Sequence, residues 1–324
     1  MMSRRNWIVV AAIAIAALIA LGSFLGGWYG SGPLRRDRTF IVPEGASLTA
    51  ASTRLEQQGI IRSASGFSLR ARILGGGRAI KAGEFAVPAH ASQARVLAII
   101  TSDNVIRRFI TIPEGMPSIM VQERLMAVGQ LSGEIPVPHE GSVLPDSYAF
   151  QSGDSREDVL RRMQAAMSRT LKELWAGRAK DIAVKTPEEA LILASIVEKE
   201  TGKPSERRMV AGLYSNRLKQ GMLLQADPTI IYPITRGKPL GRRIRQSEIQ
   251  AINDYNTYTM VGLPRQPITN PGKASIEAVL NPAQTDALYM VADGTGGHVF
   301  ASTLAEHNEN VKKWFAIRRA RGEL

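Results

Sequence analysis

An uncharged apolar run near the N-terminus is the strongest constraint on this chain. Residues 7–28 (WIVVAAIAIAALIALGSFLGGW) contain no Asp, Glu, Lys or Arg. As a helix they extend about 33 Å, enough to cross a bilayer, and Trp7 and Trp28 sit where interfacial aromatic residues are common. A cleaved signal peptide normally has a shorter apolar core that ends in small residues. We therefore expect a retained transmembrane helix that anchors the protein.

The charges around this run suggest an orientation. Arg4 and Arg5 precede it, which favours a cytoplasmic tail over residues 1–6, although three arginines within residues 35–38 follow it. Long domains cross the membrane largely regardless of such charges. We predict a single-pass protein of the inner (cytoplasmic) membrane. Beyond a linker at residues 29–37, the chain is expected on the periplasmic or extracytoplasmic side.

The composition removes several kinds of chemistry. The 324 residues include no cysteine, which excludes thiol nucleophiles, disulfides and zinc-thiolate sites. The four histidines lack the H-E-x-x-H spacing, which argues against a zinc protease. A net charge of +12 favours an anionic partner. The predicted location argues that this partner is not nucleic acid.

Two similar segments suggest a small module ahead of a larger domain. Residues 40–45 (FIVPEG) are echoed by residues 110–115 (ITIPEG), and each copy reads as a strand, a Pro-Glu-Gly turn and a helix. We predict a small α+β module over residues 38–109 and a larger α+β domain over residues 110–324. The module has no catalytic constellation, which favours a binding or spacer role. Two unrelated turns of similar sequence would also explain the echo.

The best candidate for chemistry is the end of a predicted buried helix. Residues 191–197 are apolar on all sides, and Glu198 and Glu200 fall in the last turn. Burial and the negative end of the helix dipole both raise a carboxyl pKa. A shift of two units, about 2.7 kcal/mol, would keep a general acid partly protonated near neutral pH. The periodicity does not choose between the two glutamates, and both could be surface groups paired with Lys199 or Lys203.

The loops that follow contain residue types that bind sugars. Tyr, Asn, Gln and Asp recur in residues 223–232 (LLQADPTIIY), 254–258 (DYNTY) and 268–272 (ITNPG). Aromatic rings and amides suit sugar rings and N-acetyl groups, although the same residues also form turns and helix caps. Residues 294–298 (GTGGH) lack the Lys-Ser/Thr pair of a phosphate-binding loop and are predicted to form a turn.

Seven segments together resemble the endolytic murein transglycosylases of the MltG, or YceG-like, family. They are LASIVEKET (193–201), NRL (216–218), LQADPTIIY (224–232), YNTY (255–258), GLP (262–264), NPG (270–272) and VADGTGGHVF (291–300). The resemblance covers most of the chain, makes the first module LysM-like, and places the family's catalytic glutamate at Glu200. A modest departure is Arg265-Gln266, where the family often has Pro-Gly.

The resemblance implies a lyase that acts on peptidoglycan glycan strands without a metal or other cofactor. Glu200 would protonate the β-1,4 glycosidic oxygen between N-acetylmuramic acid and N-acetylglucosamine. It would then accept the proton of the muramic C6 hydroxyl, which leaves a 1,6-anhydro end. The residues expected to hold sugars are Asn216, Gln225, Asp227, Tyr255 and Asn256. The anchor implies endolytic cleavage of nascent strands, which terminates their elongation, beside peptidoglycan synthases.

Two alternatives from other classes stay open at this stage. Asp227 could be a second carboxylate that activates water, which would make the protein a peptidoglycan hydrolase. Glu200 could instead be structural, and the protein a non-catalytic wall-binding tether for the synthesis machinery. The clustering of the distinctive motifs around Glu200 argues against the tether. The distance between Glu200 and Asp227, which the sequence does not give, bears on the hydrolase.

Overall fold

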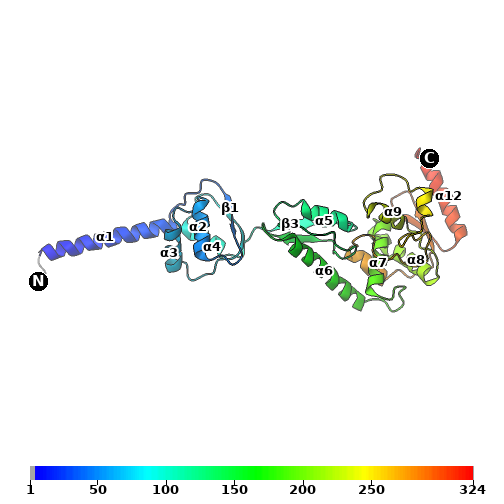
Figure 1. Cartoon of the computed structure of the whole chain (residues 1–324), viewed down its shortest axis with the longest axis horizontal. Coiled ribbons are helices and arrows are strands. Elements are labelled where there is room, and N and C mark those ends of the chain that lie inside the picture. Colours follow the sequence, from blue (N-terminus) through cyan, green and yellow to red (C-terminus); the bar gives the residue numbers. More distant parts are fainter. Residues whose placement is uncertain (1–3, 324) are drawn as a thin grey trace. The chain divides into compact units, whose positions relative to one another are not determined.

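The computed structural model describes residues 4–323, so the start of the predicted cytoplasmic tail lies outside the described residues. The chain divides into two compact units. The first unit runs up to Arg108 and includes Ala149–Ser152, whereas the second comprises Phe109–Tyr148 and the chain from Gly153 onward. Helices and short strands occur in both units, which confirms the predicted mixture of helix and sheet (Figure 1).

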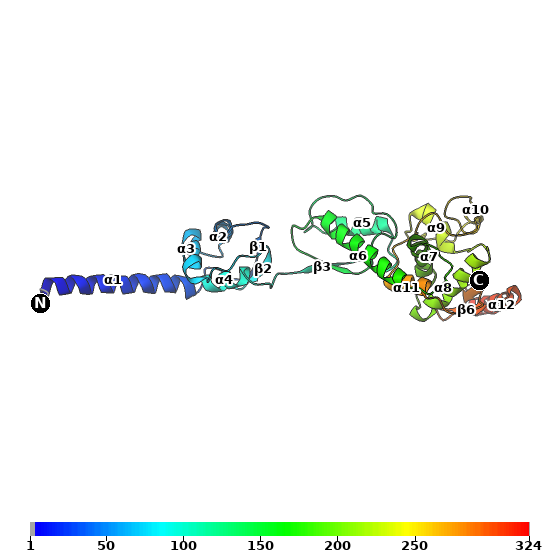
Figure 2. The same cartoon turned by 90° about the horizontal axis from the view of Figure 1, so that it is seen from below.

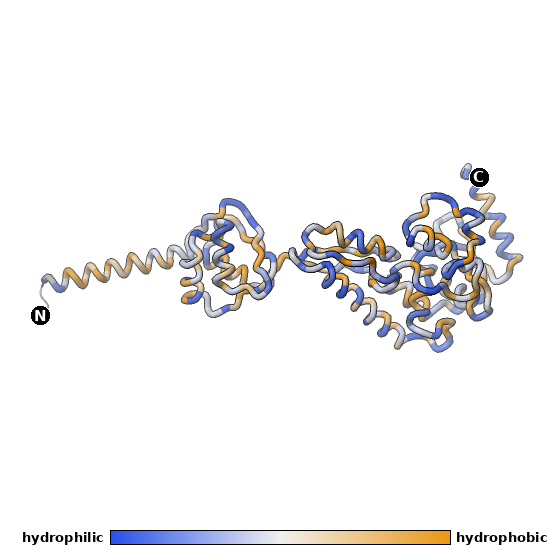
Figure 3. The backbone as a smooth tube through the Cα atoms, viewed as in Figure 1, coloured by the Kyte–Doolittle hydropathy of each residue, from blue (hydrophilic) through white to orange (hydrophobic). Residues whose placement is uncertain are grey.

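The apolar N-terminal run forms helix α1 (Arg4–Tyr29). Its stretch Asn6–Tyr29 is long and apolar enough to cross a membrane, and it is coloured as hydrophobic along most of its length in Figure 3. The C-terminal end of α1 packs into the first unit. Trp28 is only 3% exposed, and its ring centroid lies 6.1 Å from that of Phe67. Trp28 is therefore a core residue, rather than the membrane-interface residue that the sequence suggested.

The first unit packs a two-stranded antiparallel sheet against three helices. Its elements are β1 (Arg38–Val42), α2 (Leu48–Gln57), α3 (Ala64–Leu74), β2 (Gly83–Val87) and α4 (Gln93–Ile100). β1 and β2 are antiparallel, with Phe40 opposite Phe85. Both rings are fully buried beside Phe67. The three helices start at Ser47, Ser63 and Ser92, whose hydroxyls accept backbone N–H bonds three residues on.

Helices dominate the second unit, which carries the distinctive motifs. Its helices are α5 (Ser118–Met126), α6 (Arg156–Ala176), α7 (Pro187–Glu200), the 3₁₀ turn η1 (Pro204–Glu206), α8 (Arg207–Lys219), α9 (Asp227–Thr235), α10 (Gln246–Ile249), α11 (Lys273–Leu280) and α12 (Leu304–Ala320). β5 (Tyr289–Ala292) and β6 (His298–Ala301) form an antiparallel hairpin. A further two-stranded sheet joins β3 (Arg108–Thr111) and β4 (Ser147–Phe150).

Helix α7 lies in the core of the second unit, as its apolar sequence predicts. Thr186 caps it by accepting the N–H of Glu189. The residues from Leu193 to Val197 are all buried, and they pack with α8 and α11 in one hydrophobic cluster. The same helices lie beside α7 in Figure 2. This packing fixes the last turn of α7, where the two candidate glutamates are located.

One local prediction was wrong. The sequence predicts a loop over residues 223–232, but Asp227–Thr235 forms helix α9. Pro228 near the start of α9 fits a helix N-terminus, because proline has no N–H to leave unpaired there. Asp227 in the first turn suits the positive end of the helix dipole.

Candidate active site

The carboxylate of Glu198 is engaged in hydrogen bonds that stabilise the fold. Its side chain is only 6% exposed. Oε2 accepts the backbone N–H of Gly272 at 2.9 Å and the hydroxyl of Ser275 at 2.7 Å, while Oε1 lies 3.8 Å from Nη2 of Arg207. Gly272 is the N-cap of α11 and Ser275 lies in its first turn, so Glu198 accepts one backbone N–H and one hydroxyl at that helix end. Its carboxylate holds α11 against α7.

Glu200, the last residue of α7, faces a different environment. It lines a cavity of about 550 Å³ whose walls come from α8, the loop before α9, the start of α9, Tyr258 and the β5–β6 hairpin. Its Oε1 is shielded from solvent and has no hydrogen-bond partner among residues 4–323. The wall of the cavity therefore contains a carboxyl group with one oxygen that the surrounding residues leave without a hydrogen-bond partner.

The surroundings of Glu200 tune its protonation. Burial, followed by the negative charge of Asp227, raises the pKa of Glu200 to about 7. A hydrogen bond from Tyr214 and the charge of Arg217 act in the opposite direction. Both the acid and the carboxylate are then well populated near neutral pH. Such a group can give a proton and take one back within a single reaction.

Arg217 supplies a fixed positive charge beside this carboxyl group. Its Nε donates to the carbonyl of Leu288 at 2.6 Å, and Nη1 donates to that of Leu224 at 2.8 Å. Its guanidinium carbon lies 5.4 Å from the ring centroid of Tyr289. Because these contacts join α8 to the loop before α9 and to the start of β5, Arg217 positions two cavity walls as well as a charge.

Two of the predicted sugar-binding residues line the cavity with Glu200. Gln225 has φ +54°, in the left-handed region that side-chain-bearing residues rarely adopt. Backbone strain of this kind is common at functional sites. Asp227 accepts a hydrogen bond from the hydroxyl of Tyr258 at 2.6 Å. The structure thus brings Glu200, Gln225 and Asp227 to one cavity.

The other three predicted residues lie outside the cavity lining. The side-chain amide of Asn216 donates to two backbone carbonyls in the segment before β5, at 2.8 and 3.1 Å. Asn256 is fully buried, and its amide donates to two backbone carbonyls at and just after the end of α10, at 2.9 and 2.7 Å. Tyr255 lies in a separate hollow with Tyr232, and their ring centroids are 4.9 Å apart.

Tyr214, Arg217 and Tyr258 line the cavity but were not among the predicted site residues. Tyr214 and Arg217 belong to the segment around the NRL motif, from which Asn216 was chosen, and Tyr258 belongs to YNTY, from which Tyr255 and Asn256 were chosen. Each of these segments contributes to the cavity through a side chain other than the predicted ones. Which side chain of each motif enters the cavity depends on contacts with distant residues.

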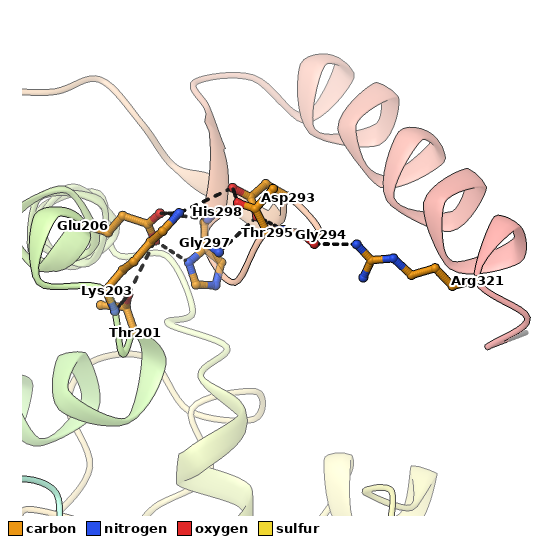
Figure 4. A network of polar contacts seen from close by, with 9 residues as sticks. All are labelled: Thr201, Lys203, Glu206, Asp293, Gly294, Thr295, Gly297, His298 and Arg321. Atoms are coloured by element: carbon orange, nitrogen blue, oxygen red, sulfur yellow. Dashed lines mark hydrogen bonds and ion pairs between the residues drawn. The ribbon is translucent and has the colours of Figure 1, made fainter.

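The β5–β6 hairpin closes one side of the cavity with His298. Figure 4 shows how this hairpin is tied to the chain just after α7. The two oxygens of Glu206 lie 3.1 Å from the backbone nitrogen of His298 and 2.9 Å from its Nδ1. Lys203 Nζ is 3.5 Å from Glu206 and 3.8 Å from Asp293 in the turn. Arg321, the C-cap of α12, donates to the carbonyl of Gly294 at 2.6 Å.

A second histidine, His307 of α12, also lines the cavity. Its ring stacks on Tyr289 with centroids 5.3 Å apart, and its Nδ1 is shielded without a hydrogen-bond partner in the described part of the chain. Burial, and then the charge of Arg217, lower the pKa of His307. No group of three or more His, Asp or Glu side chains in residues 4–323 is arranged to hold a metal ion.

Comparisons with known proteins agree on one family. The model of the YceG-like family matches residues 40–313. A protein named endolytic murein transglycosylase from Bacillus subtilis (strain 168) is 28% identical, over 93% of this chain and 92% of its own length. One of the same name from Streptococcus pneumoniae serotype 2 (strain D39 / NCTC 7466) is 27% identical, over 94% of this chain but only 64% of its own length.

A solved structure supports the same relationship. The crystal structure of a yceG-like protein from Listeria monocytogenes aligns with a TM-score of 0.53 and 25% sequence identity. The alignment covers 85% of this chain and 98% of that one. The family match includes every cavity residue described above. The chain belongs to the YceG-like family.

Proposed function

We propose that this protein is a membrane-anchored lytic transglycosylase that cuts peptidoglycan glycan strands. The observation that carries the proposal is the environment of Glu200: a carboxyl group with a free oxygen and a pKa near 7, in a cavity of about 550 Å³. Relatives over most of the chain are named endolytic murein transglycosylases. A single carboxyl that both donates and accepts a proton is what a lytic cleavage requires.

The proposed reaction uses Glu200 twice. Protonated Glu200 gives its proton to the β-1,4 glycosidic oxygen as the bond from that oxygen to C1 of N-acetylmuramic acid breaks. The electron pair of this bond stays on the leaving N-acetylglucosamine oxygen, which becomes a hydroxyl. The C6 hydroxyl of the muramic sugar attacks C1, and its proton passes to the Glu200 carboxylate. The product is a 1,6-anhydro end, no water is consumed, and Glu200 is protonated again.

The residues around Glu200 divide into two groups under this proposal. Gln225 and Asp227, which line the cavity, contact the sugars. Tyr214 and Arg217 position Glu200 and adjust its pKa through the hydrogen bond and charge described above. Asn216 and Asn256 shape the cavity walls instead of binding sugar, since their amide hydrogens are already used by backbone carbonyls.

The N-terminal part sets where this chemistry takes place. We propose that α1 spans the inner membrane and that the chain that follows α1 lies on its outer side. The active site then acts on nascent strands, endolytically, close to the peptidoglycan synthases that make them. In this proposal the α+β module over residues 38–109 is LysM-like and holds glycan or spaces the active site from the membrane.

A hydrolase is the second candidate, because Asp227 shares the cavity with Glu200. Its negative charge is the second cause of the raised pKa of Glu200, so the two carboxyl groups interact. Two interacting carboxylates are the usual equipment of a glycosidase that adds water. In the structure, however, Asp227 accepts the hydroxyl of Tyr258, and this contact favours a structural or substrate-binding role.

Mass spectrometry of the products tests both candidates. Full-length protein in detergent is incubated with uncrosslinked glycan strands, and the new ends are weighed. Ends of anhydromuramic acid would support the lytic transglycosylase. Ends heavier by one water would mean a hydrolase and would make Asp227 the next residue to replace. Absence of products with binding retained would mean that the protein is a wall-binding tether.

A further inference from the structure

We propose that His298 is a substrate-binding residue that accepts a hydrogen bond from the bound glycan through Nε2, with its ring held in place by Glu206. This inference rests on the proposed function, because it concerns the same cavity. The glycine-rich turn that contains His298 has the sequence of a simple turn. The structure makes it one wall of the cavity and connects it to the segment that follows Glu200.

The contact with Glu206 determines which ring nitrogen carries the proton. Burial raises the pKa of Glu206, but the hydrogen bonds from His298 outweigh this, and the net pKa lies below its ordinary value. An ionised carboxylate can only accept hydrogen bonds, so Nδ1 of His298 must be the donor in the 2.9 Å contact. In the neutral ring, Nε2 is then an acceptor.

The other edge of the ring is available to a ligand. No residue in the described chain hydrogen-bonds to Nε2, and Nε2 is not among the shielded atoms that lack a partner. His298 lines the cavity, whereas Glu206 does not. The contact with Glu206 occupies the Nδ1 edge of the ring and leaves the Nε2 edge for a ligand in the cavity. Sugar hydroxyls and the acetamido N–H are the donors that a glycan offers to such an acceptor.

The wall that carries His298 lies close to the segment that follows Glu200. A Cβ atom on Gly297 would overlap the side-chain ends of Glu206 and Lys203, so the turn approaches these groups closely. Asp293 accepts the N–H of Gly297 at 3.0 Å. These contacts fix the hairpin to a segment that begins at Glu200 and ends at Glu206. The acid and the histidine are therefore held by the same stretch of chain.

A substitution that keeps the Nδ1 donor and removes the Nε2 acceptor tests this role. In His298→Asn, the amide N–H takes the place of Nδ1 and can still donate to Glu206, but nothing replaces Nε2. We expect KM for uncrosslinked glycan strands to rise about tenfold, as for loss of one hydrogen bond, while kcat changes less and the thermal midpoint stays within a few degrees. His139→Asn, at an exposed histidine outside the cavity, is the matched control and should leave KM unchanged.

The opposite pattern would overturn the proposal. If His298 only fastened the hairpin, His298→Asn would behave like the control in KM, and His298→Gln, which loses the Glu206 contact, would lower the thermal midpoint alone. If the wild-type protein proves not to cleave, the proposed function fails. The same variants then report on His298 through their affinity for purified glycan strands, where unchanged affinity of His298→Asn would be evidence against it.

A measurement without any change at His298 guards against misfolding of the variants. The full-length Glu200→Gln protein, labelled with ¹⁵N-histidine, is titrated with short glycan fragments, and the four histidines are resolved by NMR. The proposal requires the Nε2 resonance of His298 to shift on binding while its Nδ1 resonance moves little. If fragments bind and Nε2 of His298 does not respond, the ring does not contact the substrate.

Discussion

Glu198 and Glu200 leave the last turn of α7 on different sides and meet different surroundings. Glu198 receives a backbone N–H and a hydroxyl at the start of α11, with Arg207 nearby. Glu200 enters a cavity with one oxygen unpaired, and burial raises its pKa to about 7. The fold supplies hydrogen-bond donors to the Glu198 carboxylate, and this carboxylate in turn stabilises the fold. One oxygen of Glu200 has no such donor, and that carboxyl group is left able to exchange a proton.

A third carboxyl group shows that a raised pKa alone does not identify the site. Burial raises the pKa of Glu140 to about 7 as well. Both oxygens of Glu140 nevertheless accept the N–H of Ser118, at 3.0 and 3.1 Å, and Glu140 does not line the Glu200 cavity. The feature that distinguishes Glu200 is the combination of a shifted pKa, a free oxygen and a cavity large enough for sugars.

The largest expected effect is the loss of cleavage in Glu200→Gln. The amide can neither give nor accept the proton, so we expect the rate to fall about 10²- to 10⁴-fold or more. The fold should be retained, because Oε1 of Glu200 makes no hydrogen bond to the described protein that the amide would break. The measurement is the rate of new-end formation on uncrosslinked strands, with circular dichroism as the check on folding.

Glu140→Gln is the matched control for this experiment. It removes a carboxyl group of the same shifted pKa without touching the cavity, and cleavage should remain close to that of the wild type. A folded Glu200→Gln protein that still cleaves at the wild-type rate would remove Glu200 from the mechanism.

The same variant should also change how stability depends on pH. Glu200 binds a proton with an ordinary pKa of 4.5 in the unfolded chain and about 7 in the folded one, so the folded state holds more protons between these values. Stability then falls as pH rises through this window, by about 3 kcal/mol in total. Glu200→Gln removes this loss, so its unfolding free energy relative to the wild type should rise between pH 4.5 and pH 8.

Urea unfolding of the full-length protein in detergent at several pH values measures this difference. Glu140→Gln should show a pH effect of the same sign, because burial shifts that group in the same direction. A gap between Glu200→Gln and the wild type that stays constant from pH 4.5 to pH 8 would mean that the Glu200 carboxyl group is not shifted in the folded protein.

Local sequence predicted the position of this turn but not the difference between its two glutamates. The apolar run that ends at Val197 predicts the helix and its burial, and both are confirmed. The partners of Glu198 come from residues 74 and 77 positions away. No periodicity within α7 contains that information. Only the family resemblance pointed to Glu200.

The missed residues have the same physical explanation. Arg217 looks like a surface residue of an amphipathic helix, yet it is 8% exposed because a carbonyl 71 residues away accepts its Nε. Asn216, its neighbour in sequence, points to other carbonyls of the same segment. Trp28 is a similar case. The sequence shows the apolar pattern of α1, whereas the packing of Trp28 on Phe67 depends on tertiary structure.

Replacing Glu198 should mainly lower stability, whereas replacing Glu200 should mainly lower the rate of cleavage. Glu198→Ala leaves the N–H of Gly272 and the hydroxyl of Ser275 without their acceptor, and we expect a loss of about 2 kcal/mol in unfolding free energy. The rate of cleavage by the folded fraction should fall less than it does for Glu200→Gln. Urea unfolding and the end-formation assay measure the two quantities, and a stable but inactive Glu198→Ala protein would exchange the roles assigned to the two glutamates.

The smallest effect is expected from Asp227→Asn, and it separates the two candidate reactions. The negative charge of Asp227 helps to raise the pKa of Glu200, so the asparagine lowers that pKa. Because Glu200 must be protonated to start the reaction, the alkaline limb of the kcat profile moves to lower pH. We expect a roughly two- to fivefold loss at pH 8 with little change at pH 6. Asp254→Asn, at an exposed carboxylate paired with Arg265, is the control and should leave the profile in place.

If Asp227 instead activates water, Asp227→Asn would abolish cleavage at every pH. Anhydro ends that persist in Asp227→Asn would leave Glu200 as the single carboxyl group that the reaction needs.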